Sequence, residues 1–214
     1  MKPTKSVLER NIIYLDYDKR RTKRTNSSKM NIPNKEQLNA LRDECHKIAC
    51  DNGFEDEQLS ERHSLCMVIT ELAEAVDADR KGRHADIKTF NAALDGFECE
   101  VAFEGYIKDT VEDELADTAI RILSLCGMSG YDIGIGVTDI AKQGDYSVEL
   151  AYFESARFTE CIFSIVEDLM TVGCDLALYD LFILADVIGF DLMEFIRLKM
   201  NYNRTRERLH GKRY

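Results

Sequence analysis

Apolar residues recur every three or four positions along much of the chain, which is the spacing of one buried helical face. In residues 34–51 this pattern runs into Asp51-Asn52-Gly53, a typical C-terminal stop signal. A second run begins at Ser60, a candidate N-cap, and stops at Gly82. The pattern therefore predicts two amphipathic helices, over 34–51 and 60–81.

A third helix is predicted from about Asp109 through Leu125, with Gly127 and Gly130 as its stops. The stretch before it, 82–108, is too apolar for a solvated linker, although glycines interrupt any long helix there. We therefore expect this stretch to form a packed excursion, with a short helix, that closes over a site.

Residues 128–147 contain four glycines and predict a connection. The next stretch, 148–171, is apolar nearly all round, so a helix there needs partners on several sides, within the core or across a subunit interface. Two more helices are predicted over 174–187 and 190–208. Together these patterns predict an all-α fold with one helical domain over 33–214.

Composition agrees with a folded helical chain. Hydrophobic residues make up 45% of it, with two prolines and no tryptophan, and it holds no run of apolar residues long enough to span a bilayer. The opening MKPTKSVLERN lacks the apolar segment of a secretory signal. We therefore expect a cytoplasmic protein that does not engage a membrane.

The seven cysteines are an odd number without the spacing of a disulfide framework, and they include no Cys-x-x-Cys pair. A structural zinc site of that type therefore has little support. We interpret Cys45, Cys50, Cys66, Cys126 and Cys161 as small core residues in a reducing cytosol.

The net charge of −11 is unevenly distributed. Residues 1–30 carry nine Lys and Arg against three acids, and residues 197–214 carry seven against one, so the body between them is strongly acidic. An acidic body disfavours stable nucleic-acid binding, whereas basic ends beside acidic helices suit a phosphorylated small molecule held with metal ions. We interpret residues 1–32 as a basic, flexible arm.

Acidic residues share one face on two of the predicted helices. Glu71 and Glu74 are three residues apart, and Glu114 and Asp117 repeat this spacing among apolar neighbours. Carboxylates on facing inner surfaces repel one another unless protons or cations neutralise them. Oxygen ligands without histidine or cysteine suit Mg²⁺, with Mn²⁺ as a substitute. The alternative is that these acids lie on solvated faces, as acids of Glu-rich helices usually do.

The last predicted helix carries a row of hydrogen-bond donors. Lys199, Asn203 and Arg206 lie at i, i+4 and i+7, and Lys212 follows in a basic tail. Donors in such a row bind phosphate oxygens or a base edge, and Arg121, one turn beyond Asp117, is placed to join them. The alternative is that basic residues complement the helix dipole, which does not explain Asn203.

Three segments together resemble the MazG-like, all-α nucleoside triphosphate pyrophosphohydrolase superfamily, most closely its phage- and bacteria-borne branch. They are TELAEAVDADRKG (70–82), KDTVEDELADTAIRIL (108–123) and LKMNYNRTRERLHGK (198–212). The resemblance implies a MazG-like helical bundle completed by oligomerisation, as a homodimer or homotetramer. Relative to the compact family core, this chain inserts a connection and a helix at about 128–173.

The resemblance also implies Mg²⁺-dependent hydrolysis of nucleoside triphosphates, non-canonical or deoxy ones included, at the α–β phosphate bond to a monophosphate and pyrophosphate. The family motif implies that the catalytic metal ligands are Glu71, Glu74, Glu114 and Asp117. It implies nucleotide contacts by Lys199, Asn203 and Arg206, to which Arg121 and Lys212 are added by position. Thr70 stands where many relatives have glutamate, which implies fewer metal ions or a different group that positions water.

Two other classes of protein fit parts of the sequence. A di-iron carboxylate bundle needs two inward-facing Glu-x-x-His pairs, and only Glu207 with His210 has that spacing. A non-catalytic helical interaction or oligomerisation protein would use the same amphipathic helices around a degenerate site. Within the enzyme class, the base and the sugar stay open, and pyrimidine deoxynucleotides and phosphoribosyl-ATP are among the alternatives.

Overall fold

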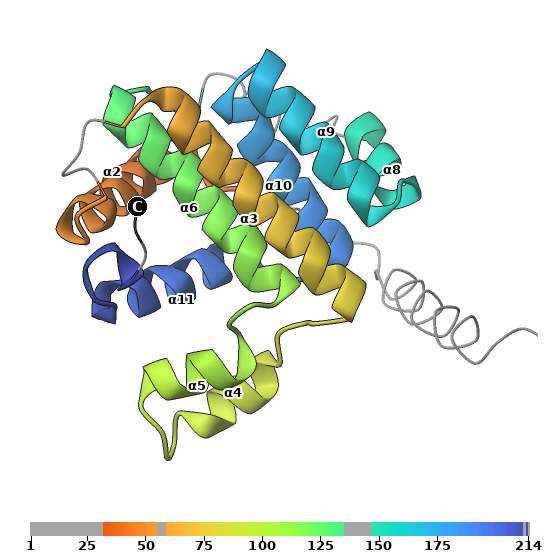
Figure 1. Cartoon of the computed structure of the whole chain (residues 1–214). Coiled ribbons are helices and arrows are strands. Elements are labelled where there is room, and N and C mark those ends of the chain that lie inside the picture. Colours follow the sequence, from red (N-terminus) through yellow and green to blue (C-terminus); the bar gives the residue numbers. More distant parts are fainter. Residues whose placement is uncertain (1–31, 55–58, 135–146, 212, 214) are drawn as a thin grey trace, which may run out of the picture.

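The structure is a computed structural model that describes residues 32–54, 59–134, 147–211 and 213. Every regular element in these ranges is a helix, so the predicted all-α fold is confirmed for this part of the chain (Figure 1). The elements are α2 (Lys35–Asp51), α3 (Glu61–Lys81), α4 (Ile87–Ala93), α5 (Cys99–Tyr106), α6 (Val111–Ser129), α8 (Ser147–Ser155), α9 (Phe158–Thr171), α10 (Cys174–Ile188), α11 (Leu192–Thr205) and the 3₁₀ turn η1 (Arg208–Gly211).

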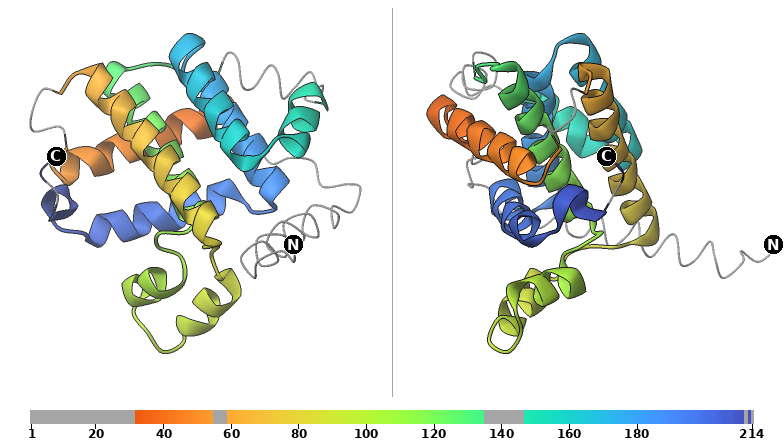
Figure 2. Two further views of the ribbon diagram at one scale, coloured as in Figure 1. Left: turned by 45° about the vertical axis from the view of Figure 1, so that its right-hand side comes forward. Right: turned by 60° about the vertical axis from the view of Figure 1, so that its left-hand side comes forward.

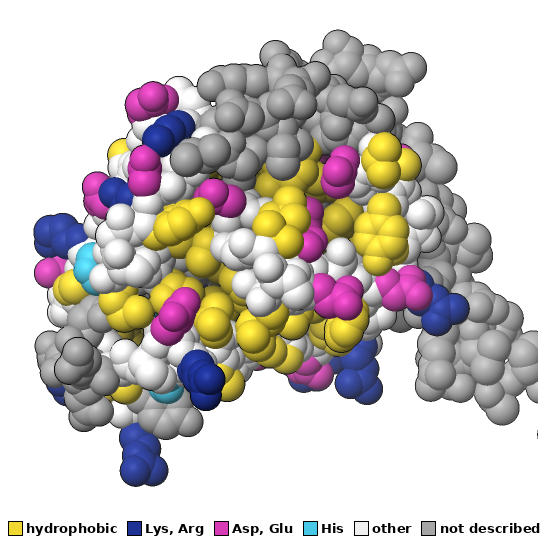
Figure 3. Space-filling model, turned by 90° about the horizontal axis from the view of Figure 1, so that it is seen from above, with side chains coloured by type: hydrophobic (Ala, Val, Ile, Leu, Met, Phe, Trp, Pro, Cys, Tyr) yellow, Lys and Arg dark blue, Asp and Glu magenta, His cyan; other side chains and the backbone are white. Residues whose placement is uncertain are grey.

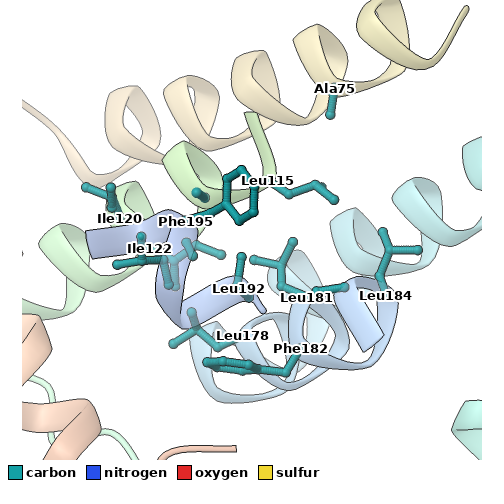
Figure 4. Close-up of a cluster of buried hydrophobic side chains, with 14 of the residues drawn as sticks. Ala75, Leu115, Ile120, Ile122, Leu178, Leu181, Phe182, Leu184, Leu192 and Phe195 are labelled. Carbon is teal, nitrogen blue, oxygen red and sulfur yellow. The ribbon is translucent and has the colours of Figure 1, made fainter. Parts of the chain in front are cut away.

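Helix α6 lies at the centre of the bundle. It packs against α3, α2, α11 and α10, while α9 and α8 cover the far side of α10 (Figures 1 and 2). Figure 4 shows the core between them, where Leu115 and Ile122 of α6 lie near Leu181 of α10 and Phe195 of α11. The helix that carries the candidate acids Glu114 and Asp117 is therefore also the main core helix.

The helix ends follow the capping residues that the sequence supplies. The side chain of Asn34 accepts a hydrogen bond from the backbone N–H of Gln37 and completes a capping box. The Ser60 hydroxyl accepts from the N–H of His63, and Gly82 closes α3 with a φ of 66°, a left-handed conformation that favours glycine. The boundaries predicted for these two helices are confirmed.

Gly127 does not stop the third helix, which is where the prediction was wrong. The residue lies inside α6, and the helix ends at Ser129 with Gly130 as its left-handed cap. A Cβ at position 127 would lie 2.5 Å from the Cβ of His46 on α2. Glycine is present here because α2 and α6 approach closely, and not because the chain must turn.

The single helix predicted over 148–171 is two helices, α8 and α9, separated at Ala156 and Arg157. Helix α9 begins with its own N-cap after the break, where the N–H of Arg157 donates to the carboxylate of Glu160 at 2.7 Å. Helix α9 packs on α10 and α3 but leaves Phe163 and Met170 exposed, so the described part of the chain does not surround it. The helix that is buried all round is α10, with nine consecutive buried residues from Ala177 to Ala185.

Residues 82–108 form the packed excursion that the sequence predicts, with two short helices, α4 and α5, instead of one. They make a hairpin that projects from one end of the bundle (Figures 1 and 2). Phe90 and Phe103 are buried, and the Phe103 ring stacks on Tyr202 of α11 at 4.4 Å between centroids. Phe97 and Val101 at its outer part are exposed.

The remaining expectations concern the end of the last helix, the cysteines, the N-terminal arm and membrane-spanning helices. The last helix ends at Thr205 and not at residue 208. Cys50 and Cys66 are exposed, so they are not core residues, whereas Cys45, Cys126 and Cys161 are buried as predicted. The basic arm proposed for residues 1–32 lies outside the described residues except for Ile32. In the described ranges, no helix is long and apolar enough to cross a membrane.

A candidate carboxylate site between α3, α6 and α11

Three of the four predicted carboxylates meet where α3 crosses α6. Glu71 from α3 and Glu114 and Asp117 from α6 each place one oxygen within 4.8 Å of the others. Glu71 and Glu114 are almost completely buried, at 2% and 4% exposed. Glu74, one turn further along α3, is exposed and lies outside this group of three, although its charge acts on Glu71. Its predicted part in metal binding remains a prediction.

The N-terminal turn of α6 is unusually acidic and buried. Thr110 caps the helix through its side chain, and the following residues Glu112, Asp113 and Glu114 are all buried. Negative charge near a helix N-terminus is stabilised by the helix dipole and by backbone N–H groups without intrahelical partners. Asp113, which the sequence-based prediction did not single out, is the most buried of these acids at 1% exposed.

Lys199 is the central cation of the site. Its ammonium lies 2.9 Å from Oδ2 of Asp113 and 3.4 Å from Oδ2 of Asp117, and its side chain is almost completely buried. The sequence predicted that Lys199 contacts a nucleotide, whereas here it holds two carboxylates of α6 together. The spacing of Asp113 from Asp117, one helical turn, was the available signal for a shared partner on a neighbouring helix.

Arg121 is the second cation of the cluster, although the sequence predicted it as a substrate-binding donor, which remains a prediction. The Nε of Arg121 donates to Oε1 of Glu71 at 2.5 Å, so α6 and α3 are linked by an ion pair across their crossing. Thr70, where relatives of the resembled family have a carboxylate, donates its hydroxyl to the carbonyl of Cys66 at 3.0 Å in its own helix. Thr70 therefore adds no charge to the site.

The cluster carries more negative than positive charge. Four carboxylates, those of Glu71, Asp113, Glu114 and Asp117, face the two cations Lys199 and Arg121. Full ionisation therefore leaves two negative charges without a partner in this part of the chain, which is the charge that one divalent cation would balance.

The ionisation of the acids follows from this imbalance. Burial, together with Asp113, raises the pKa of Glu114 to about 9, and burial together with Asp117 raises the pKa of Glu71 to about 7. Burial alone would raise the pKa of Asp117, but the positive charges of Lys199 and Arg121 outweigh burial and hold this pKa below its usual value. Without a bound cation, Glu114 is therefore protonated at pH 7, whereas Glu71, whose pKa lies near this pH, is protonated only in part.

The donor set fits a hard divalent cation. All the candidate ligand atoms are carboxylate oxygens, which Mg²⁺ and Mn²⁺ prefer. In addition, Oδ1 of Asp113 is buried without a hydrogen-bond partner among the described residues, and an unpartnered carboxylate oxygen is costly unless a cation or water meets it. Glu71, Glu114 and Asp117 are the residues that would hold such an ion.

A cavity of about 110 Å³ opens beside the cluster and has Asp117 and Arg121 in its wall. Its apolar side is formed by residues of α2, α3 and α6, and its other side by Asn203, Arg206 and His210. Burial, followed by the charge of Arg206, lowers the pKa of His210 to about 4, so this imidazole is neutral at pH 7. The cavity thus joins an apolar wall to neutral and cationic hydrogen-bonding groups.

The predicted row of donors on the last helix is only partly formed. Asn203 is buried at the cavity wall, while Arg206 follows the end of α11 with an extended backbone and reaches the cavity from there. Arg206 lies over the Tyr202 ring, 5.5 Å from its centroid. Lys212 lies outside the described residues.

Comparisons with models of protein families, with curated proteins and with solved structures find no match for this chain.

Proposed function

We propose that the chain is a Mg²⁺-dependent nucleoside triphosphate pyrophosphohydrolase, which converts a triphosphate and water into a monophosphate and pyrophosphate. The observation that carries the proposal is the meeting of Glu71, Glu114 and Asp117 within 4.8 Å, with an excess of negative charge, at the edge of a cavity. The resemblance of the three sequence segments to the MazG-like superfamily supports the same reaction.

The residues of the cluster have separable roles in this proposal. A divalent cation, when bound, would neutralise phosphate oxygens and lower the pKa of a water molecule. Arg121 and Arg206 lie at the same cavity and are placed to bind phosphate oxygens, since guanidinium groups match their geometry. Lys199 pairs with Asp113 and Asp117 and holds these two carboxylates in position, and its own side chain is buried.

The cavity limits where the rest of the substrate sits. At about 110 Å³ it is smaller than a typical pocket for a whole nucleotide, for which some 300 Å³ or more is usual. We propose that it takes the base or the sugar, with the phosphates directed toward Asp117 and Arg121. Asn203 and the neutral His210 then supply the hydrogen bonds that orient this group.

The test is pyrophosphate release from a panel of ribo- and deoxyribonucleoside triphosphates, canonical and damaged, with Mg²⁺ and with a chelator. We expect pyrophosphate and the matching monophosphate in equal amounts, lost on chelation. Glu114→Gln should abolish turnover and keep the fold, because this neutral side chain matches the protonated glutamate in shape. Glu167→Gln, an exposed acid on α9, is the matched control and should keep full activity. Activity of the Glu114 variant equal to that of the control would refute the proposed site.

A non-catalytic interaction protein is the second candidate, and one observation favours it. Helix α9 exposes Phe163 and Met170, and the hairpin exposes Phe97 and Val101. Figure 3 shows hydrophobic side chains at the surface, interspersed with acidic ones, on the face seen from above. Such surfaces mark protein contacts, and we propose a homodimer or homotetramer as the assembled state in either case.

The two candidate functions differ in their response to ligand. An enzyme of the proposed class gains thermal stability from Mg²⁺ together with a non-hydrolysable triphosphate, and Glu114→Gln reduces that gain. An interaction protein shows neither effect. A well-folded protein that shows neither ligand-dependent stabilisation nor pyrophosphate release would refute the first candidate for the triphosphates tested.

A further inference from the structure

Two cysteines meet where the end of α6 reaches the start of α10. Cys126 is buried in the last turns of α6, and Cys174 is the first residue of α10 and is partly exposed. The two thiols are hydrogen-bonded to each other. Neither of these two cysteines belongs to the carboxylate cluster described above.

Hydrogen bonds of Tyr131 join the same two helix ends as the cysteine pair. The carbonyl of Cys126 accepts a hydrogen bond from the N–H of Tyr131 at 2.8 Å. The hydroxyl of Tyr131 in turn donates to Oδ2 of Asp175, the residue after Cys174, at 3.1 Å. Tyr131 therefore links the end of α6 to the start of α10, and this second contact helps to keep the two cysteines close together.

We propose that Cys126 and Cys174 form a peroxide-responsive thiol pair, in which Cys174 is oxidised first and Cys126 resolves it to an intramolecular disulfide. Redox-sensing cysteines are accessible, rich in thiolate and adjacent to a resolving cysteine. Cys174 is the accessible member, and it lies at a helix N-terminus where Gly173 offers no side-chain cap. Cys126 is the adjacent, sheltered member.

Electrostatics assign the two roles in the same direction. The hydrogen bond from the Cys126 thiol lowers the pKa of Cys174, and the same bond raises the pKa of Cys126. Cys174 is thus both the more exposed thiol of the pair and the one whose pKa the contact lowers. Because the thiolate is the nucleophile, Cys174 is the first to react.

The reaction balances with hydrogen peroxide as the oxidant. The Cys174 sulfur attacks one peroxide oxygen, the O–O bond breaks, and the leaving hydroxide takes a proton to give water and a sulfenic acid. The Cys126 sulfur then attacks the Cys174 sulfur, the S–O bond breaks, and the hydroxide leaves as water with the proton of the Cys126 thiol. One peroxide thus oxidises two thiols to one disulfide and releases two waters.

Disulfide formation would reach the cavity through α6. Leu125 and Met128, on either side of Cys126, line that cavity, so a cross-link fixes this wall to α10. The inference does not rest on the proposed enzymatic function, because it concerns thiols that lie outside the carboxylate cluster, and its test uses no substrate.

The experiment treats the full-length chain with increasing hydrogen peroxide and then blocks the remaining thiols with an alkylating reagent. We expect the free thiols to fall from seven to five per chain and a reductant to restore them. Cleavage after Lys and Arg places Cys126 in the peptide 122–142 and Cys174 in the peptide 158–197, which also contains Cys161. Fragmentation of the cross-linked product should locate the bond at Cys174.

Variants separate the two roles. Cys126→Ala should leave a sulfenic acid at Cys174, captured by a sulfenic-acid reagent, and Cys174→Ser should keep all its thiols under the same dose. Cys99→Ser removes an exposed cysteine and should still form the disulfide. Oxidation of Cys99 in preference to Cys174, a bond to Cys161, or no loss of thiols in the wild type would each overturn the proposal.

Discussion

Replacing Lys199 tests whether the acidic cluster is held together as the structure describes. Lys199→Met keeps much of the volume and apolar stem of the side chain but removes the ammonium that contacts Asp113 and Asp117. Removing one partner of a buried ion pair usually costs about 3–5 kcal/mol, because it leaves a charge without compensation. We expect about 3 kcal/mol at pH 7, the lower end of that range, because Asp113 can take up a proton.

The pH dependence of this loss provides an internal check. Burial already raises the pKa of Asp113 to about 6 in spite of Lys199, so removal of the lysine raises this pKa further. A raised carboxyl pKa favours the folded state at low pH and disfavours it as pH rises through the folded pKa. The difference in free energy of unfolding between wild type and Lys199→Met should therefore be smaller at pH 5 than at pH 7.

Urea unfolding, followed by circular dichroism at both pH values without divalent cations, measures this difference. The double variant Lys199→Met with Asp113→Asn should recover part of the loss, because the most buried carboxylate is then neutral while an oxygen remains to accept the N–H of Asp109. A loss below about 1 kcal/mol at pH 7, typical of an exposed pair, would show that the ammonium is not buried between these acids.

Three further outcomes follow from single contacts. Gly127→Ala should destabilise the fold by about 1–3 kcal/mol in thermal or urea unfolding, since the new methyl would overlap the Cβ of His46, whereas Gly105→Ala meets nothing within 4 Å and should not. Burial raises the pKa of Asp180 from 3.8 to about 8, so the ionised carboxylate destabilises the folded state increasingly as pH rises between these values. Asp180→Asn should therefore raise the free energy of unfolding at pH 8 by at least about 1 kcal/mol and have little effect near pH 4. Arg206→Ala should raise KM for the triphosphate more than it lowers kcat, and an unchanged KM would remove Arg206 from the site.

The helices that the sequence predicted best are those with explicit end signals. Ser60 and Gly82 act on the backbone within a few residues, so their effect can be recognised without knowing the fold. Gly127 is also a glycine, but it allows His46 of another helix to pack closely and does not end its own helix. Its role depends on a tertiary contact, which a local pattern does not contain.

The candidate site shows the same division. The spacing of Glu114 from Asp117 correctly placed both on one face of α6, because helical periodicity alone decides it. No sequence pattern linked Lys199 with Asp113, since their contact joins residues 86 positions apart. The break between α8 and α9 was missed for a related reason, because the apolar residues continue across it and only the interaction of Arg157 with Glu160 marks the new start.

The position of the acidic cluster on α6 has a consequence for amide hydrogen exchange. Helix α6 packs against α2, α3, α10 and α11, so its central amides exchange only when several helices separate together. Fraying of one loop or one terminus does not expose them. A ligand held by Glu114 and Asp117 should therefore slow exchange throughout the bundle, and its protection should extend to amides of α10 that contribute no group to the site.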